Sequence, residues 1–230
     1  LLCIYFVMHM TKLTNFLVLF LVLNFSSYSQ NFLSTSGSSI VNENGDTIIF
    51  RGMGLGGWMV QEGYMMAPGG FSSTQYQIKD RLIELIGEEE TDVFYHNWLS
   101  NHVRKIDIDS MKQWGFNLIR VPIHYNLFTE PIENEPFPNA YTEKEIGFTL
   151  LDSLLSWCKQ NQIYLMIDLH AAPGGQGYNA DISDYDPTKP SLWESTLNQN
   201  KTVELWRRRA SRYKNEEWIA GYDLINEPSW

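Results

Sequence analysis

Short apolar segments alternate with amphipathic helical patterns along most of this chain, and that alternation constrains its fold more than any other feature. Strands are predicted where apolar and β-branched residues predominate, at residues 47–50, 116–122, 163–169 and 219–225. Helices are predicted between and beside them, at residues 75–86, 88–102, 106–114, 142–161 and 200–213. Strands that alternate with helices require a parallel sheet with right-handed crossovers. The predicted fold class is therefore α/β.

Local signals predict three further details. Asn44-Gly45 lies between the apolar runs 40–41 and 47–50, which is a strong hairpin signal. Thr142 and Glu145 have the spacing of a capping box, which should open the helix at 142–161. The basic run 207–209 is predicted to be the solvated face of the last helix.

Polar residues gather where the predicted strands end. Arg120 lies near the end of one strand, His170 follows the next, and the last strand runs into Asn226 and Glu227. In (β/α)8 barrels the active site lies at the carboxyl ends of the strands, and the loops after these strand ends are long. We therefore predict a (β/α)8 barrel of which about the first four strands are present. Four strands leave two unpaired edges, so the other half is expected downstream.

Each of these polar residues also has a simpler interpretation. Asn226 and Glu227 before a proline are typical of a helix start. Arg120 is suited to a structural ion pair. Asp168 and His170 point to one side of a strand and would need His124 as a third ligand to bind a metal, but no further His or Asp cluster supports that reading. No metal is predicted.

Composition narrows the class of partner. The formal net charge is −10, and it becomes −11 without residues 1–29, which contain Lys12 and no acidic residue. Such a charge repels nucleic acid and anionic lipid and suits a neutral ligand. The chain has eight Trp, twelve Tyr and twelve Phe residues, and the C–H face of a sugar packs on rings of this kind. After residue 29 only Cys158 remains, so no disulfide framework is predicted.

Four segments in order resemble glycoside hydrolase family 5, the cellulase-like retaining β-glycosidases built on (β/α)8 barrels. They are residues 50–58, 119–122, 168–174 and 224–228, and the resemblance extends from about residue 40 to the end. The first segment, with Glu62 four residues after Trp58, is most similar to the exo-β-1,3-glucanase branch. Residues 30–230 are therefore expected to be the N-terminal part of such a catalytic domain.

The resemblance implies catalytic roles for three residues. Glu227 matches the general acid/base, Asn226 the residue that bonds the 2-hydroxyl group, and Arg120 the arginine beside the nucleophile. The nucleophile itself, a carboxylate at the end of the seventh strand, has no counterpart in this sequence. In such enzymes one carboxyl group protonates the leaving oxygen while a second attacks the anomeric carbon, and no cofactor is needed.

The resemblance implies substrate contacts for His170, Glu62 and, more loosely, His124. The function it implies is hydrolysis of a β-glucan, by an exo-β-1,3-glucanase or a cellulase-like enzyme, with an oligo- or polysaccharide as the partner. A non-catalytic carbohydrate-binding relative with the same fold is the alternative. The residue at the end of strand seven separates the two, because only the enzyme needs a carboxylate there.

Residues 1–29 are predicted to be upstream residues followed by a signal peptide. Met10 and Lys12 open a charged segment, and residues 13–25 form an apolar core that is too short for a good membrane span. Residues 1–9 are expected to precede the true start. The expected location is secreted, periplasmic or at the cell surface, without stable insertion in the membrane.

The small residues Ser27 and Ser29 predict cleavage before Gln30. We expect the mature protein to begin near Gln30, and N-terminal sequencing of the secreted protein measures this directly. A mature protein that retained residues 13–25 would contradict the prediction.

Overall fold

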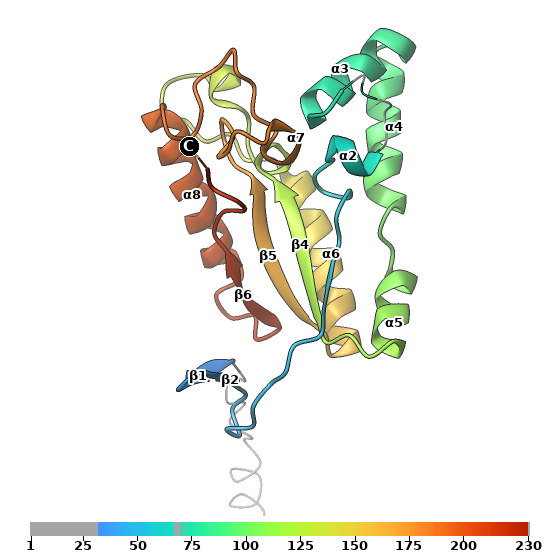
Figure 1. Cartoon of the computed structure of the whole chain (residues 1–230), viewed down its shortest axis with the longest axis vertical. Coiled ribbons are helices and arrows are strands. Elements are labelled where there is room, and N and C mark those ends of the chain that lie inside the picture. Colours follow the sequence, from blue (N-terminus) through green and yellow to red (C-terminus); the bar gives the residue numbers. More distant parts are fainter. Residues whose placement is uncertain (1–31, 67–69, 71, 230) are drawn as a thin grey trace, which may run out of the picture. The chain divides into compact units, whose positions relative to one another are not determined.

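The centre of the structure, a computed structural model that describes residues 32–66, 70 and 72–229, is a four-stranded parallel sheet (Figure 1). Its strands are β3 (Gly52–Gly54), β4 (Leu118–His124), β5 (Tyr164–Ala171) and β6 (Ile219–Asp223). Each strand pairs with the next one along the chain, in the order β3-β4-β5-β6. The predicted parallel α/β arrangement is confirmed. The predicted signal segment at 1–29 lies outside the described residues.

Helices connect the strands and lie alongside the sheet (Figure 1). Between β3 and β4 the chain forms α2 (Gly63–Met66), α3 (Gln75–Ile86), α4 (Glu88–Asn101) and α5 (Lys105–Gln113). Between β4 and β5 it forms the short η1 (Tyr125–Leu127) and η2 (Ile132–Asn134) and then α6 (Glu145–Asn161). Between β5 and β6 it forms α7 (Ala180–Ser183) and α8 (Thr196–Arg212). All five predicted helices are present, with ends shifted by a few residues.

One side of the sheet forms the hydrophobic core, and the other side carries the polar residues. The buried core of β4, β5 and α6 consists of Ile119, Val121, Ile123, Leu165, Ile167, Leu169, Leu151, Leu154, Leu155 and Cys158. Each of these aliphatic side chains contributes about 2 kcal/mol by leaving water. Because successive side chains of a strand point to opposite sides, Arg120 lies on the face opposite its core neighbours Ile119 and Val121. The same alternation places Asp168 and His170 on the polar face of β5.

The predicted hairpin forms only in part. Asn42 makes the turn, since its Oδ1 accepts the backbone N–H groups two and four residues further on, at 3.0 and 2.9 Å. Past the turn an antiparallel bridge joins Val41 to Thr47, and the Ile48 N–H donates to the Ile40 carbonyl at 2.8 Å, but residues 48–51 form no strand. In addition, β2 (Ser39–Val41) pairs with β1 (Ser34–Ser36). The predicted turn and its first pairs are confirmed, whereas the predicted second strand at 47–50 is wrong.

The predicted capping box at Thr142 is also wrong. Helix α6 begins at Glu145 after Lys144, whose side chain makes no capping bond. The Thr142 hydroxyl donates to Glu135 Oε2 at 2.7 Å, and its backbone N–H donates to Glu135 Oε1 at 2.9 Å. A carboxylate from the preceding loop therefore occupies the groups that would have capped the helix.

Arg209 departs from the prediction that residues 207–209 form a solvated face. Its side chain is fully buried, and the guanidinium carbon lies 3.9 Å from the ring centroid of Phe128. Burial lowers the pKa of Arg209 to about 9. The physical reason is helical periodicity: Arg209 lies four residues after the buried Leu205 and so shares its inward face.

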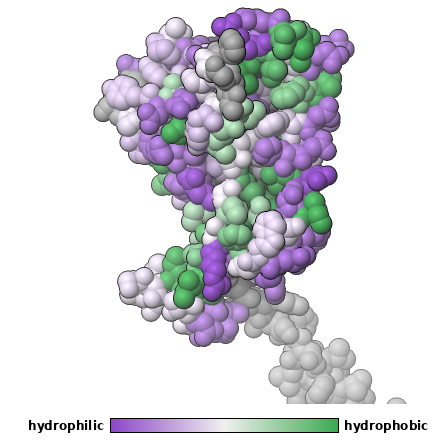
Figure 2. All heavy atoms as spheres, turned by 45° about the vertical axis from the view of Figure 1, so that its right-hand side comes forward, coloured by the Kyte–Doolittle hydropathy of each residue, from purple (hydrophilic) through white to green (hydrophobic). Residues whose placement is uncertain are grey.

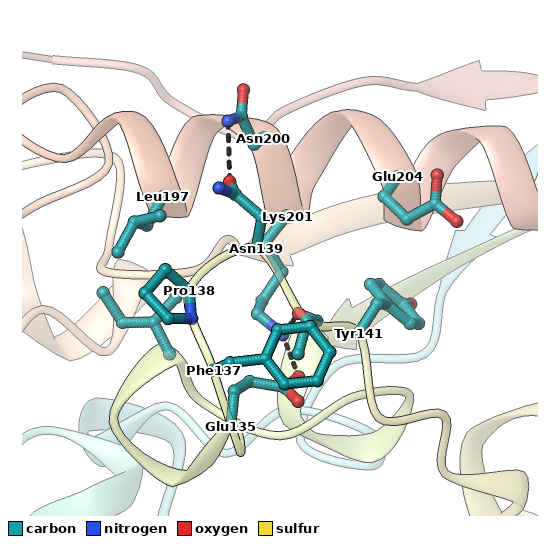
Figure 3. A pocket seen from close by; sticks show the side chains of 11 residues that line it. Glu135, Phe137, Pro138, Asn139, Tyr141, Leu197, Asn200, Lys201 and Glu204 are labelled. Carbon is teal, nitrogen blue, oxygen red and sulfur yellow. Dashed lines mark hydrogen bonds and ion pairs between the residues drawn. The ribbon is translucent and has the colours of Figure 1, made fainter.

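A buried ion pair fastens the loop before α6 to helix α8. Lys201 Nζ donates to Glu135 Oε1, and only 2% and 3% of the two side chains are exposed. Both residues line a narrow cavity of about 50 Å³. Figure 3 shows their side chains between the loop and the helix. Across the same contact, Asn200 Nδ2 donates to Asn139 Oδ1 at 2.9 Å. The loop is therefore held by specific polar contacts and not by apolar packing alone.

The side of the molecule that carries α3, α4 and α5 is a mixed surface. Large apolar side chains are exposed there, namely Leu85, Ile86, Val93, Ile106 and Trp114. Figure 2 shows apolar atoms interspersed with hydrophilic ones on this side. Among the described residues, no helix is both long and apolar enough to cross a bilayer.

The ion pair of Lys201 predicts a large stability effect. Glu135→Ala leaves a buried ammonium group without its carboxylate, and we expect the free energy of unfolding to fall by about 3–5 kcal/mol. The control is Glu133→Ala on the same loop, because Glu133 pairs with Lys189 at an exposed site and should contribute less than about 1 kcal/mol. Urea unfolding of the full-length protein measures both. Equal losses for the two variants would contradict a buried role for the pair.

Candidate active site

Three charged side chains from neighbouring strands meet on the polar face of the sheet. The strand register places Asp168 opposite both Pro122 and Asp223. Arg120 Nη2 lies 2.9 Å from Asp168 Oδ2 and 2.9 Å from Asp223 Oδ2. The Asp168 side chain is fully buried, and about a third of the Asp223 side chain is exposed. One guanidinium group therefore lies between two carboxylates and reduces the repulsion between them.

Arg120 also fixes the orientation of Asn226, which lies just beyond the end of β6. Arg120 Nη2 donates to Asn226 Oδ1 at 2.8 Å, and the Asn226 backbone N–H donates to the carbonyl of Leu169 at 3.0 Å. Because Oδ1 already accepts a hydrogen bond from a cation, the amide nitrogen Nδ2 must point the other way. It lies 3.4 Å from His170 Nε2.

His170 connects this cluster to Glu62, which comes from the segment after β3. The ring contacts Asp168 Oδ2 through Nδ1 at 2.7 Å and Glu62 Oε1 through Nε2 at 3.2 Å. Burial by itself would lower the pKa of His170, but the hydrogen bonds and charges of the two carboxylates outweigh it and raise the pKa to about 9. At neutral pH both ring nitrogens therefore donate, and Nε2 cannot accept a hydrogen bond from Asn226.

Glu227 is exposed at the edge of this cluster. Its φ of 42° is uncommon for a residue other than glycine, and strain of this kind often marks a functional site. Burial raises the pKa of Tyr64, and the negative charges of Glu62, Asp181 and Glu227 raise it further. The Tyr64 hydroxyl donates to Glu62 Oε1 at 3.3 Å, and Glu227 directly follows Asn226 of the cluster in the chain. No helix begins between residues 226 and 229, the last described residue.

His124 is the last residue of β4 and lies opposite Ala171, the neighbour of His170, in the register with β5. Its Nε2 contacts Asp184 Oδ2 at 2.8 Å, and its Nδ1 accepts the backbone N–H of Asn126 at 3.1 Å. His124 and Asp184 line a cavity of about 330 Å³ with Tyr76 and Tyr125, and none of the clustered residues lines it. Among the described residues, the side-chain hydrogen bonds of His124 are with Asp184 and Asn126 and not with the other predicted site residues. In the described part of the chain, no three His, Cys, Asp or Glu residues are grouped as metal ligands.

Two residues of the cluster were missed by the sequence analysis. Asp223 is an acidic residue within an otherwise apolar strand, and that position alone was a usable signal because an unpaired buried charge is costly. Gln176 is fully buried and donates through Nε2 to the carbonyls of His170 and Asn226, at 2.7 and 2.9 Å. A lone glutamine in a glycine-rich loop carries no pattern that would have identified it.

The sequence profile of the cellulase family, glycosyl hydrolase family 5, matches residues 81–230. The chain belongs to this family. A β-xylosidase of Phanerodontia chrysosporium is 35% identical over 199 residues, which cover 86% of this chain and 40% of that protein. A probable glucan 1,3-β-glucosidase A of Aspergillus niger is 30% identical over 183 residues, covering 79% of this chain and 41% of that protein. The chain thus spans about 40% of the length of these family 5 relatives.

Solved structures support the same fold. A rutinosidase from Aspergillus niger matches 78% of this chain and 49% of its own chain, with a TM-score of 0.57 at 18% identity. The protein AoRut matches 78% of this chain and 48% of its own, with a TM-score of 0.62 at 16% identity. With the family match, these likenesses confirm the predicted family and the barrel fold, of which four strands are described here.

Within this family 5 domain, contacts link four of the six residues predicted for the site, namely Arg120, His170, Glu62 and Asn226. Glu227 directly follows Asn226 in the chain, and His124 lies opposite Ala171, the neighbour of His170, in the register of β4 and β5. Their roles in binding and catalysis remain predictions. The alternative interpretation of Arg120 as an ion-pair residue is also correct, because Arg120 pairs with Asp168 and Asp223.

The raised pKa of His170 predicts a pH dependence. A folded-state pKa of about 9, against an unfolded value of about 6.5, means that the charged ring stabilises the fold below about pH 6.5 and that this contribution is lost as the pH rises through 9. Asp168→Asn should shift the titration of His170 to lower pH, which NMR of the imidazole protons measures. Asp184→Asn, beside His124, is the matched control and should leave the His170 curve in place. An unchanged curve in Asp168→Asn would show that Asp168 does not hold the proton on His170.

Proposed function

We propose that the full-length protein is an exported retaining β-glycosidase that hydrolyses a β-glucan, with an exo-β-1,3-glucanase or a cellulase-like activity. The observation that carries this proposal is the 2.8 Å hydrogen bond from Arg120 Nη2 to Asn226 Oδ1. Asn226 directly precedes Glu227 in the chain, and this bond turns its amide nitrogen away from Arg120. Relatives named as a β-xylosidase, glucan 1,3-β-glucosidases and an endoglucanase support a β-linked glycoside as the substrate class.

In the proposed reaction Glu227 acts first as an acid and then as a base. Its carboxylic acid gives a proton to the glycosidic oxygen as the C1–O bond breaks, while a second carboxylate bonds to C1. Water then loses a proton to Glu227 and attacks C1, which releases the sugar with its original anomeric configuration. The exposed position of Glu227 suits a group that must reach both a leaving oxygen and a water molecule.

Asn226 is the proposed partner of the sugar 2-hydroxyl group. Arg120 occupies Oδ1, and the charged ring of His170 cannot accept a hydrogen bond from Nδ2. The N–H groups of Asn226 Nδ2 are therefore available as donors to a hydroxyl oxygen. Such a bond strengthens as positive charge develops on the sugar ring, so it favours the transition state over the bound substrate.

Glu62 and His170 are the proposed contacts to the terminal sugar. The Tyr64 hydroxyl and the His170 ring both contact Oε1 of Glu62, at 3.3 and 3.2 Å. The other carboxylate oxygen, Oε2, is then suited to accept hydrogen bonds from sugar hydroxyls. A buried carboxylate that binds two neighbouring hydroxyls would favour the end of a chain, which supports the exo-acting candidate.

The proposal requires a second carboxylate about 5–5.5 Å from Glu227. Family resemblance places that nucleophile at the end of the seventh strand, and this chain spans about 40% of the length of its relatives. All contacts of Arg120 with described residues use Nε and Nη2, so Nη1 is suited to reach a carboxylate from a later strand. Beside the cation that carboxylate would stay ionised, as a nucleophile must.

A non-catalytic carbohydrate-binding relative is the second candidate, since the same cluster would also suit a sugar. Both candidates would bind a sugar, but only the glycosidase would hydrolyse it. Export from the cytoplasm belongs to the proposal as well, on the strength of the apolar segment and small-residue site before Gln30.

The deciding experiment compares two substrates in the full-length protein. Glu227→Ala should lower kcat/KM on a β-glucan by about 10²- to 10⁴-fold, because the leaving oxygen then lacks its proton. An aryl β-glucoside with an activated leaving group needs little protonation, so its loss in kcat/KM should be much smaller.

The outcomes separate the candidates. Wild-type protein that binds laminari- or cello-oligosaccharides without hydrolysing them supports the binding relative. A Glu227→Ala variant that is equally impaired on both substrates would falsify the acid/base role of Glu227. Asp181→Ala, which removes a nearby acidic residue without a proposed role, is the matched control.

A further inference from the structure

The amide of Gln176 joins the ends of two strands. The residue is fully buried in the loop after β5. Its Nε2 donates to the carbonyl oxygen of His170 at 2.7 Å and to that of Asn226 at 2.9 Å, while its Oε1 accepts the backbone N–H of Ala172 at 3.0 Å. Both donor hydrogens and the acceptor oxygen of one side chain are therefore used to fix the backbone at the site.

The backbone of Gln176 continues the same connection. Its carbonyl oxygen accepts the backbone N–H of Ser229 at 3.1 Å and the indole N–H of Trp193 at 2.9 Å. Asn226 and Ser229 flank Glu227 on its two sides in the chain. Gln176 thus holds the backbone immediately before Glu227 and that two residues after it.

Glu227 needs such support because its backbone is in the left-handed region, with φ of 42°. A residue with a side chain stays in that region only where its surroundings hold it there. The next residue in the β5 loop, Gly177, makes room for this segment. A Cβ atom at Gly177 would lie 2.9 Å from Ser229 Oγ and 3.1 Å from the Glu227 carbonyl oxygen, both tighter than ordinary contact.

We propose that Gln176 is a positioning residue for Glu227. The side-chain amide of Gln176 sets the direction in which the Glu227 carboxyl group leaves the backbone. This inference rests on the proposed function, since it assigns to Gln176 a role in the acid/base step. No other common side chain offers two donor hydrogens and an acceptor at this length, apart from a flipped arrangement of the same amide. A carboxylate at this position would face two carbonyl oxygens without a hydrogen to share.

Two variants of the full-length protein separate positioning from folding. Gln176→Met keeps the length and removes every side-chain hydrogen bond, whereas Gln176→Glu keeps the shape and, only when protonated, can donate one. The exposed helical residue Gln160 supplies the matched control, Gln160→Met. If the acid is displaced by about 1 Å, we expect kcat/KM for an alkyl β-glucoside to fall about 100-fold in Gln176→Met.

Three results are expected together if Gln176 positions the acid. The loss should be much smaller for an aryl glucoside with an activated leaving group, which does not depend on protonation. Lowering the pH should restore part of the alkyl glucoside activity in Gln176→Glu and none in Gln176→Met, each relative to wild type at that pH. Gln160→Met should match wild type on both substrates.

Equal losses on the two substrates, or no recovery of Gln176→Glu at low pH, would overturn the inference, because a purely structural role gives both.

Backbone amide exchange tests the same contacts without activity. In Gln176→Met the amides of Ala172, Asn226, Glu227 and Ser229 should exchange faster while those of β4 are unchanged, and unchanged exchange at Asn226, Glu227 and Ser229 would also overturn the inference. If the wild-type protein hydrolyses neither substrate, the proposed function fails, and this exchange measurement alone decides whether Gln176 holds the segment.

Discussion

The polar side of this sheet depends on one guanidinium group, that of Arg120. Asp168 is buried completely, and its Oδ1 has no hydrogen-bond partner among the described residues. A buried carboxylate in that state would cost several kcal/mol without a cation beside it. Arg120 and His170 both meet its other oxygen, Oδ2, at 2.9 and 2.7 Å. The positive charges thus allow Asp168 to remain buried, and Asp168 in turn fixes where they lie.

The same network links the strand geometry to the site. Because side chains alternate along a strand, Arg120, Asp168 and His170 face one way while their neighbours fill the core. Arg120 orients Asn226, and His170 contacts Glu62, which lies in the segment after β3. The site is therefore assembled from strands β4 and β5 and from the segments that follow β3 and β6. This sharing of one network explains why a substitution at one strand end should be felt at the others.

The sequence predicted the strands and the polar residues at their ends because each carries a periodic or positional signal. Arg120 and His170 interrupt apolar runs within parallel strands and Asn226 follows one, and the structure brings all three together. The errors arose where a local pattern competed with tertiary contacts. Arg209 belongs to a basic run but follows helical periodicity into the core, and Thr142 bonds a loop carboxylate instead of capping a helix. Gln176 was missed because its importance lies in its contacts with residues that are 6 and 50 positions away in the chain.

We propose that this cluster places Glu227 to act in a double displacement with a second carboxylate. The anomeric configuration of the first product, read by proton NMR during hydrolysis of a β-glucan by the full-length protein, tests this proposal. The β-anomer should appear first and then mutarotate, since two displacements at C1 retain the configuration. An α-anomer as the first product would mean a single displacement by water and would contradict the proposed role of Glu227.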